Sequence, residues 1–327
     1  MSHVLVLIFQ TLFKSFPRPI PNLPRHCVHQ GILFKMAGGH LGSSPQPRLG
    51  QLIKRHLHDW LILLVLGVII WILNAVEPFH RYLSKEMLTP DIKYPFKEDT
   101  VPMFVVPVYA LLLPCIIFLM YYISRRDVYD LHYAIIGILF SVLITAVITD
   151  AIKDAVGRPR PSFFYRCFPD GKPVFQTNGD VLCTNLAEKV IKEGYKSFPS
   201  GHTSWSFAGL GFLGWYLCGK IKVFNGEGYA AKLCIVVLPY LAAALVGISR
   251  VDDYWHHWTD VFAGAMIGST ISATCYLQFF PFPHLPNGWA PHASFTRIED
   301  NRCSKDAVDS KVANAVGDLE GGGKTYF

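Results

Sequence analysis

Six long apolar runs alternate with polar segments along the chain. A helix needs about 20 apolar residues, with a range of about 17–25, to cross a bilayer. The runs are Trp60–Val76, Val101–Ile123, His132–Thr149, Gly201–Gly219, Leu233–Ser249 and Val261–Phe280. The second and the sixth carry no charged residue. The pattern predicts an all-α, polytopic membrane protein, with a six-transmembrane-helix bundle over residues 57–283.

The composition agrees with a membrane protein. Hydrophobic residues make up 51% of the chain and charged residues 17%, whereas soluble proteins carry about 25% charged residues. Buried helices of a large soluble fold are the alternative, but six such runs with few charges argue against it. The net charge of +6 is modest and the chain has no basic stripe with interleaved aromatics. A nucleic-acid partner is therefore not expected, and the oligomeric state stays open.

The two ends of the chain differ from the apolar part. Residues 1–56 contain no acidic side chain, which is typical of organelle targeting segments; a disordered cytosolic tail is the alternative. Residues 284–327 are predicted to form a largely disordered tail, because their last part is polar and rich in glycine. The endoplasmic reticulum or plasma membrane is the expected location, with the plastid envelope as the alternative that a targeting segment would imply.

Short basic loops predict the orientation, because such loops stay in the cytosol. Lys54 and Arg55 precede the first run, and Arg125 and Arg126 lie between the second and the third. Three lysines in 220–232 lie between the fourth and the fifth. All three segments fall on one side of a six-span chain, so this side and both termini are expected to be cytosolic.

Polar clusters fall at span ends on the opposite, non-cytosolic side. The first contains Lys153 and Arg160 at the end of the third run, and the second contains Ser200, Gly201 and His202 at the start of the fourth. Ser200 is predicted to cap a helix whose free N–H groups suit an anion. Each cluster also has a structural interpretation when taken alone. The first could be a set of cations at a bilayer boundary, and the second could be a plain helix cap.

A third cluster lies between the fifth and the sixth runs. Arg250 offers a planar fork for phosphate oxygens. The spacing of His256 and Asp260 predicts neighbours on one helical face, where the carboxylate would fix the imidazole tautomer. A metal site is the alternative, built from Asp252, Asp253, His256, His257 and Asp260, but this spacing fits no common metal motif. Together the three clusters suit phosphoryl chemistry without a metal.

These motifs carry a resemblance to a known family. Lys153-x6-Arg160-Pro161, Pro199-Ser200-Gly201-His202 and Ser249-Arg250-x5-His256-x3-Asp260 resemble the three-part signature of the type 2 phosphatidic acid phosphatase/haloperoxidase superfamily. Within it, the chain is most similar to the plant lipid phosphate phosphatases over roughly 57–283. The resemblance implies hydrolysis of phosphatidic acid, a phospholipid of the bilayer, to diacylglycerol and phosphate, with no metal and no other cofactor.

The resemblance also implies roles for the cluster residues. His256 would be the nucleophile that forms a phosphohistidine, Asp260 would orient it, and His202 would protonate the leaving alcohol and then activate water. The residues that would hold the phosphoryl oxygens are Lys153, Arg160, Ser200, Gly201 and Arg250. Arg158 and His257 fall outside the signature and are interpreted as surface charge and interfacial packing.

Other functions stay open as alternatives. Other lipid phosphates, such as diacylglycerol pyrophosphate, lysophosphatidate and sphingoid or isoprenoid phosphates, are alternative substrates. Two further alternatives stay within the superfamily: hydrolysis of a soluble sugar phosphate, and halide oxidation with bound vanadate. The six predicted spans argue against the second, haloperoxidase, alternative. An anion transporter is a remote alternative, because transporter sites lie near the bilayer midplane rather than at span ends.

Two of the eight cysteines, Cys167 and Cys183, lie in the segment between the third and the fourth runs. In an oxidising compartment they could form a disulfide. Their separation in sequence does not establish the geometry, so the pairing stays open.

Overall fold

The structure, a computed structural model, describes residues 49–224, 226 and 228–296. Every described residue belongs to one compact unit of the chain, within 46–327. The described part is helical and contains no strand beyond an isolated bridge between Phe175 and Val181. The all-α prediction is therefore confirmed for this part. Most of the predicted N-terminal tail, and the C-terminal tail after residue 296, lie outside the described residues.

A long helix occupies each of the six predicted apolar runs. These helices are α3 (Leu57–Ala75), α4 (Leu113–Arg125) with the turns η4 (Met103–Val105) and η5 (Val108–Leu112) before it, α5 (Val128–Val156), α8 (Gly201–Lys220), α9 (Ala230–Asp252) and α10 (Trp258–Phe279). Shorter helical elements join them: α2 (Leu49–Arg55), η2 (Lys85–Met87), η3 (Pro90–Ile92), α6 (Phe163–Cys167) and α7 (Glu188–Gly194).

Four of the described helical segments are long and apolar enough to cross a membrane. They are Leu57–Ala75, Met103–Arg125, Val128–Val156 and Ala230–Asp252. The helices α8 and α10 are also long, with 20 and 22 residues, but they contain more glycine, serine and threonine. Most of α8 is buried, so its side chains face other helices and need not be strongly apolar. The chain is therefore an integral membrane protein by the character of its helices.

Glycines of α10 bring this helix into contact with the start of α8. A Cβ at Gly264 would lie 2.6 Å from the carbonyl oxygen of Ser200, and a Cβ at Gly268 would lie 2.3 Å from that of Ser204. Small residues of this kind let helices approach closely. As a result, the backbone N–H of Ser200 donates to the carbonyl of Asp260 at 3.0 Å. This contact joins the second polar cluster to the third.

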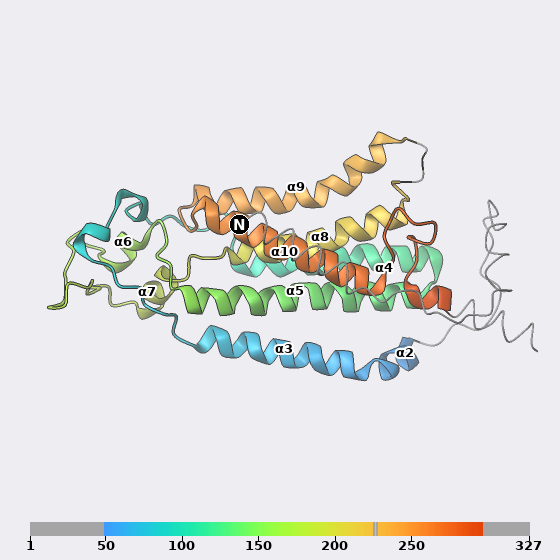
Figure 1. Ribbon diagram of the computed structural model, residues 1–327, viewed down its shortest axis with the longest axis horizontal. Coiled ribbons are helices and arrows are strands. Elements are labelled where there is room, and N and C mark those ends of the chain that lie inside the picture. The colour runs from blue at the N-terminus through green and yellow to red at the C-terminus, as the bar shows by residue number, and fades with distance from the viewer. Residues whose placement is uncertain (1–48, 225, 227, 297–327) are drawn as a thin grey trace, which may run out of the picture. The chain divides into compact units, whose positions relative to one another are not determined.

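Figure 1 shows that α5 and α9 end, and α8 and α10 begin, at the same end of the bundle. The helices α6 and α7 lie beyond this end. They belong to a second small core, formed by Leu83, Leu88, Ile92, Phe163, Phe164, Cys167, Phe168, Val181 and Tyr195. A disulfide joins Cys167 to Cys183 within it, so the pairing that the sequence left open is present.

Candidate active site

The three predicted polar clusters meet at the helix ends described above. In the first cluster, Nη1 of Arg160 lies 3.3 Å from Nε2 of His256 in the third. A Cβ on Gly201 would lie 2.7 Å from Nζ of Lys153, which places the first cluster against the second. The structure thus brings together residues that are up to about a hundred positions apart in the sequence.

His256 lies in the turn between α9 and α10, and its side chain is almost fully buried. We assign the Nδ1 proton to a hydrogen bond that Nδ1 donates to the carbonyl of Ser197, at 2.6 Å. In the neutral ring this assignment leaves Nε2 unprotonated. Burial and the Arg160 guanidinium hold the pKa of His256 well below its ordinary value of 6.5. The ring is therefore neutral at pH 7, with a free nitrogen beside a cation.

His256 and Asp260 lie close together, but not on one helical face as the spacing predicted. The helix α9 ends at Asp252, Tyr254 adopts a left-handed conformation with φ 59°, and α10 begins only at Trp258. Nδ1 of His256 is 3.7 Å from Oδ2 of Asp260, which is longer than a good hydrogen bond. The carbonyl of Ser197, which the sequence did not suggest, therefore orients the imidazole most directly.

Asp260 is held by three other donors. Its Oδ1 accepts from Nη1 of Arg158 at 2.6 Å, and its Oδ2 accepts from Oγ of Ser197 at 2.6 Å and from the backbone N–H of His257 at 3.0 Å. Asp260 thus fixes both the turn that carries His256 and the residue whose carbonyl binds Nδ1. Arg158, interpreted from the sequence as surface charge, is part of this network, and no motif spacing indicated it.

Arg160 is buried and uses most of its donors on the protein. Its Nε donates to the carbonyl of Glu193 at 2.6 Å, Nη1 to the carbonyl of Trp255 at 3.0 Å, and Nη2 to the Glu193 carboxylate at 3.0 Å. Glu193 lies in the last turn of α7 and was not expected from the sequence. These bonds fix the guanidinium beside His256, where it can meet a phosphoryl oxygen.

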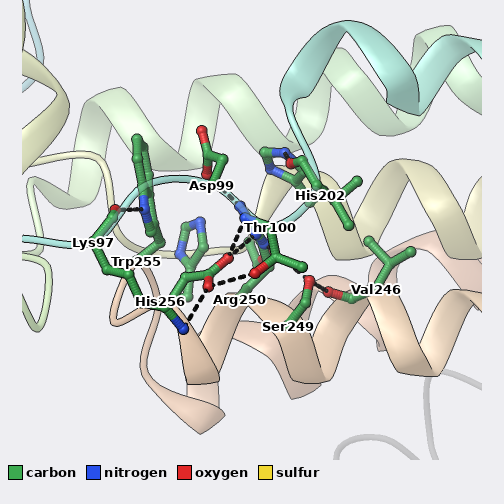
Figure 2. Close-up of polar contacts among 12 residues, drawn as sticks. Lys97, Asp99, Thr100, His202, Val246, Ser249, Arg250, Trp255 and His256 are labelled. Atoms are coloured by element: carbon green, nitrogen blue, oxygen red, sulfur yellow. Dashed lines mark hydrogen bonds and ion pairs between the residues drawn. The ribbon is translucent and has the colours of Figure 1, made fainter.

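Arg250 is fully buried and forms ion pairs with Asp99 and Asp253. Asp253 is held in turn by the backbone N–H and the hydroxyl of Thr100, at 2.8 and 2.7 Å. Figure 2 shows this network around Arg250. A phosphoryl group that binds Arg250 must compete with Asp99, whose side chain is 26% exposed and is the more accessible partner.

His202 lies in the first turn of α8. Ser200 caps this helix, as predicted, because its side chain accepts from the backbone N–H of Thr203. Nε2 of His202 lies 3.0 Å from the carbonyl of Val101, so we place the proton of the neutral ring on Nε2. In the view of Figure 2, Arg250 lies between His202 and His256.

The side chains of the metal-site alternative do not gather at one point. Asp253 faces Arg250 and Lys97, whereas Asp260 faces Arg158. A carboxylate that is already paired with a cation is a poor metal ligand, so the arrangement favours the phosphate interpretation of this cluster.

Comparison with known proteins decides the family. Residues 134–283 match the PAP2 superfamily. The chain is 60% identical over 277 residues to "Lipid phosphate phosphatase 2" of Arabidopsis thaliana, a match that covers 84% of this chain and 94% of that protein. The chain belongs to the PAP2 superfamily.

Two other relatives extend the comparison. The chain is 62% identical over 267 residues to "Probable lipid phosphate phosphatase 4" of the same plant, which covers 81% of this chain and 86% of that protein. It is 32% identical over 236 residues to "Diacylglycerol pyrophosphate phosphatase 1" of Saccharomyces cerevisiae, covering 70% and 81% respectively. No solved structure matches the chain.

Proposed function

We propose that this PAP2 superfamily member is a lipid phosphate phosphatase that hydrolyses phosphatidic acid to diacylglycerol and phosphate without a divalent metal. The observation that carries the proposal is the position of Nε2 of the buried His256, 3.3 Å from Nη1 of Arg160, which donates a hydrogen bond to it. A nucleophile beside a fixed cation is what attack on a phosphate monoester requires. The names of the Arabidopsis relatives support the same activity.

In the first step, Nε2 of His256 attacks the phosphorus, and the bond between phosphorus and the diacylglycerol oxygen breaks. His202, a neutral ring in the free protein, takes up the proton of the phosphate monoanion that binds beside it and donates this proton to the leaving oxygen. The phosphorylated imidazole becomes positively charged, and the carbonyl of Ser197, 2.6 Å from Nδ1, stabilises that charge. Asp260, 3.7 Å from Nδ1, adds a negative charge nearby.

The phosphoryl oxygens are held by charge and by a helix N-terminus. Lys153, Arg160 and Arg250 supply cations, and the N–H groups at the start of α8, with Ser200 and Gly201, supply donors. The absence of a side chain at Gly201 lets Nζ of Lys153 approach this helix start, where a Cβ would lie 2.7 Å from it. In the second step, His202 accepts a proton from water, which attacks phosphorus and releases phosphate from His256.

The placement of the site suits a substrate that stays in the bilayer. In this proposal α8 and α10 also cross the membrane, which makes six spans over residues 57–283, and the site faces the non-cytosolic side. A phospholipid keeps its tails in the bilayer and brings its phosphate to the level of the helix ends. The endoplasmic reticulum or plasma membrane is the proposed location, with the plastid envelope as alternative.

Removal of divalent metals tests this proposal. The detergent-solubilised protein is expected to hydrolyse phosphatidate at the same rate with and without excess EDTA, because protein cations hold the phosphate. Loss of activity in EDTA that magnesium restores would contradict the mechanism. If the protein hydrolyses phosphatidate slowly and another phosphate rapidly, the substrate assignment changes and the proposed mechanism stands.

Substitution of Arg158 tests whether Asp260 must be held in place. In Arg158→Gln, we expect kcat for phosphatidate to fall roughly tenfold with little change in KM, since the substitution disturbs the turn that orients His256 and not the substrate contacts. Arg158→Lys should recover part of the loss. The exposed Arg81 offers a control, because Arg81→Gln removes a charge on the same side of the molecule. An unchanged kcat in Arg158→Gln would show that Asp260 needs no such support.

A further inference from the structure

Arg166 in α6 is a buried cation that the proposed mechanism does not use. Its side chain is 2% exposed, and its Nη2 has no hydrogen-bond partner. Its Nε donates to Oγ of Ser162 at 3.1 Å. Within the described residues, ion pairs link Arg160 to Glu193 and Arg250 to Asp99 and Asp253, but none links a carboxylate to Arg166. Burial of a charge without a partner costs free energy, so this position needs an explanation.

The guanidinium of Arg166 lies beside the candidate active site. It is 4.5 Å from the ring centre of Phe96 and 4.3 Å from that of Trp255. Arg160 contacts the same Trp255 ring at 4.8 Å. Because both guanidinium carbons lie at these distances from the same ring centre, they are at most about 9 Å apart. Trp255 directly precedes His256 in the chain, so Arg166 lies within about 9 Å of the Arg160 guanidinium that would meet the transferred phosphoryl group.

The small outer core fixes the backbone at Arg166. The side-chain amide of Asn185 donates to the carbonyl of Arg166 at 2.7 Å. The next residue, Cys167, forms the disulfide with Cys183, and its carbonyl accepts from the backbone N–H of Thr184 at 2.9 Å. Since a disulfide, a side-chain amide and stacked aromatic rings all act on this one position, the orientation of the guanidinium is preorganised and not incidental.

The surroundings of Arg166 favour an anion as the missing partner. Burial and the nearby Arg160 guanidinium lower the pKa of Arg166 to about 9, so the side chain is still charged at pH 7. A bound anion would favour the charged form of Arg166, as the carboxylates of Glu193 and Asp99 already do. Arginine presents a planar set of donors that matches phosphate oxygens, and Arg160 is within reach to bind a neighbouring phosphoryl group.

We propose that Arg166 binds a second phosphoryl group of the substrate, next to the one that is transferred, and thereby makes the site selective for lipid diphosphates over lipid monophosphates. This inference rests on the proposed phosphatase function. Nε2 of His256 attacks the terminal phosphorus, the bond from that phosphorus to the bridging oxygen breaks, and the lipid monophosphate leaves with its phosphoryl group on Arg166. Water then releases inorganic phosphate from His256, so one water is consumed for each diphosphate cleaved.

Comparison of two lipids in the full-length, detergent-solubilised protein tests the proposal. The measured quantity is the ratio of kcat/KM for diacylglycerol pyrophosphate to kcat/KM for phosphatidate with the same acyl chains. In Arg166→Gln we expect this ratio to fall roughly 10- to 100-fold, which is the effect of losing a charge-assisted hydrogen bond. Arg166→Lys, which keeps the charge, should give an intermediate ratio. Lys172→Gln removes an exposed charge from the same segment and should leave the ratio unchanged.

Other outcomes overturn the proposal. An equal loss on both lipids would show that Arg166 only supports the fold, and an unchanged ratio would show that it does not contact the substrate. Inorganic pyrophosphate and phosphate provide a second measurement through their competition for the site. Wild type should bind pyrophosphate about tenfold or more tightly than phosphate, and Arg166→Gln should lose this preference. If wild type hydrolyses neither lipid, the phosphatase function fails, and the preference for pyrophosphate still decides the role of Arg166.

Discussion

Replacement of His256 by alanine should abolish phosphatidate hydrolysis, with kcat lower by about 10⁴-fold or more, as losses of catalytic nucleophiles generally are. His256 is the residue whose free nitrogen lies beside the Arg160 guanidinium, 3.3 Å away. Its neutral state at pH 7 means that no other group has to remove a proton before attack. The measurement is the initial rate of phosphate release from phosphatidate in mixed micelles.

Folding must be separated from catalysis in this variant. His256 is buried, so its loss leaves a small cavity and an unpaired carbonyl at Ser197; the thermal unfolding of the variant should be measured beside its activity. His80→Ala is a matched control, because His80 is an exposed histidine outside the site. A folded His256→Ala protein that keeps more than a small fraction of wild-type activity would remove His256 from the role of nucleophile.

Arg160→Ala is expected to lower kcat/KM for phosphatidate by about 10³-fold, since loss of a fixed donor to the developing charge costs roughly 10²–10³-fold and Arg160 also carries a full charge. Arg160→Lys should recover only a small part, because an ammonium cannot reproduce the fork that contacts Glu193, Trp255 and His256 together. The kcat/KM values of both variants, measured beside wild type, check this expectation.

The contacts of Arg160 also stabilise the fold, so stability again needs its own measurement. Glu193→Gln offers the matched variant, because it removes the carboxylate partner but keeps the arginine. We expect a much smaller loss of activity in Glu193→Gln than in Arg160→Ala. Similar losses in the two variants would show that the ion pair, and not contact with the phosphoryl group, is what matters at this position.

The helices and the meeting of the three clusters could be predicted from the sequence. Apolar runs of bilayer length identify helices without any knowledge of packing, and the cap at Ser200 follows from local chemistry. Alternate helices run in opposite directions, so polar segments after the third and fifth runs and before the fourth and sixth fall at one end. For this reason the prediction from the sequence that Lys153, Arg160 and His256 lie at one end of the bundle agrees with the structure.

The contacts within the site could not be predicted in the same way. The spacing of His256 and Asp260 indicated a helix, but the left-handed Tyr254 and the late start of α10 place His256 in a turn. Arg158, Glu193 and Asp99 come from segments without regular periodicity, and tertiary packing sets their conformations. Composition was also incomplete as a guide, because the mostly buried α8 and the partly exposed α10 are less apolar than the other long helices.

The central claim is that phosphate passes through a covalent bond to Nε2 of His256. Rapid mixing of the protein with phosphatidate that carries a radiolabelled phosphate, followed by an alkaline quench and peptide mapping, tests it most directly. We expect a label that is stable to alkali and labile to acid, located on the peptide that contains His256 and absent from His256→Ala. A label on another peptide, or the same label in His256→Ala, would contradict the claim.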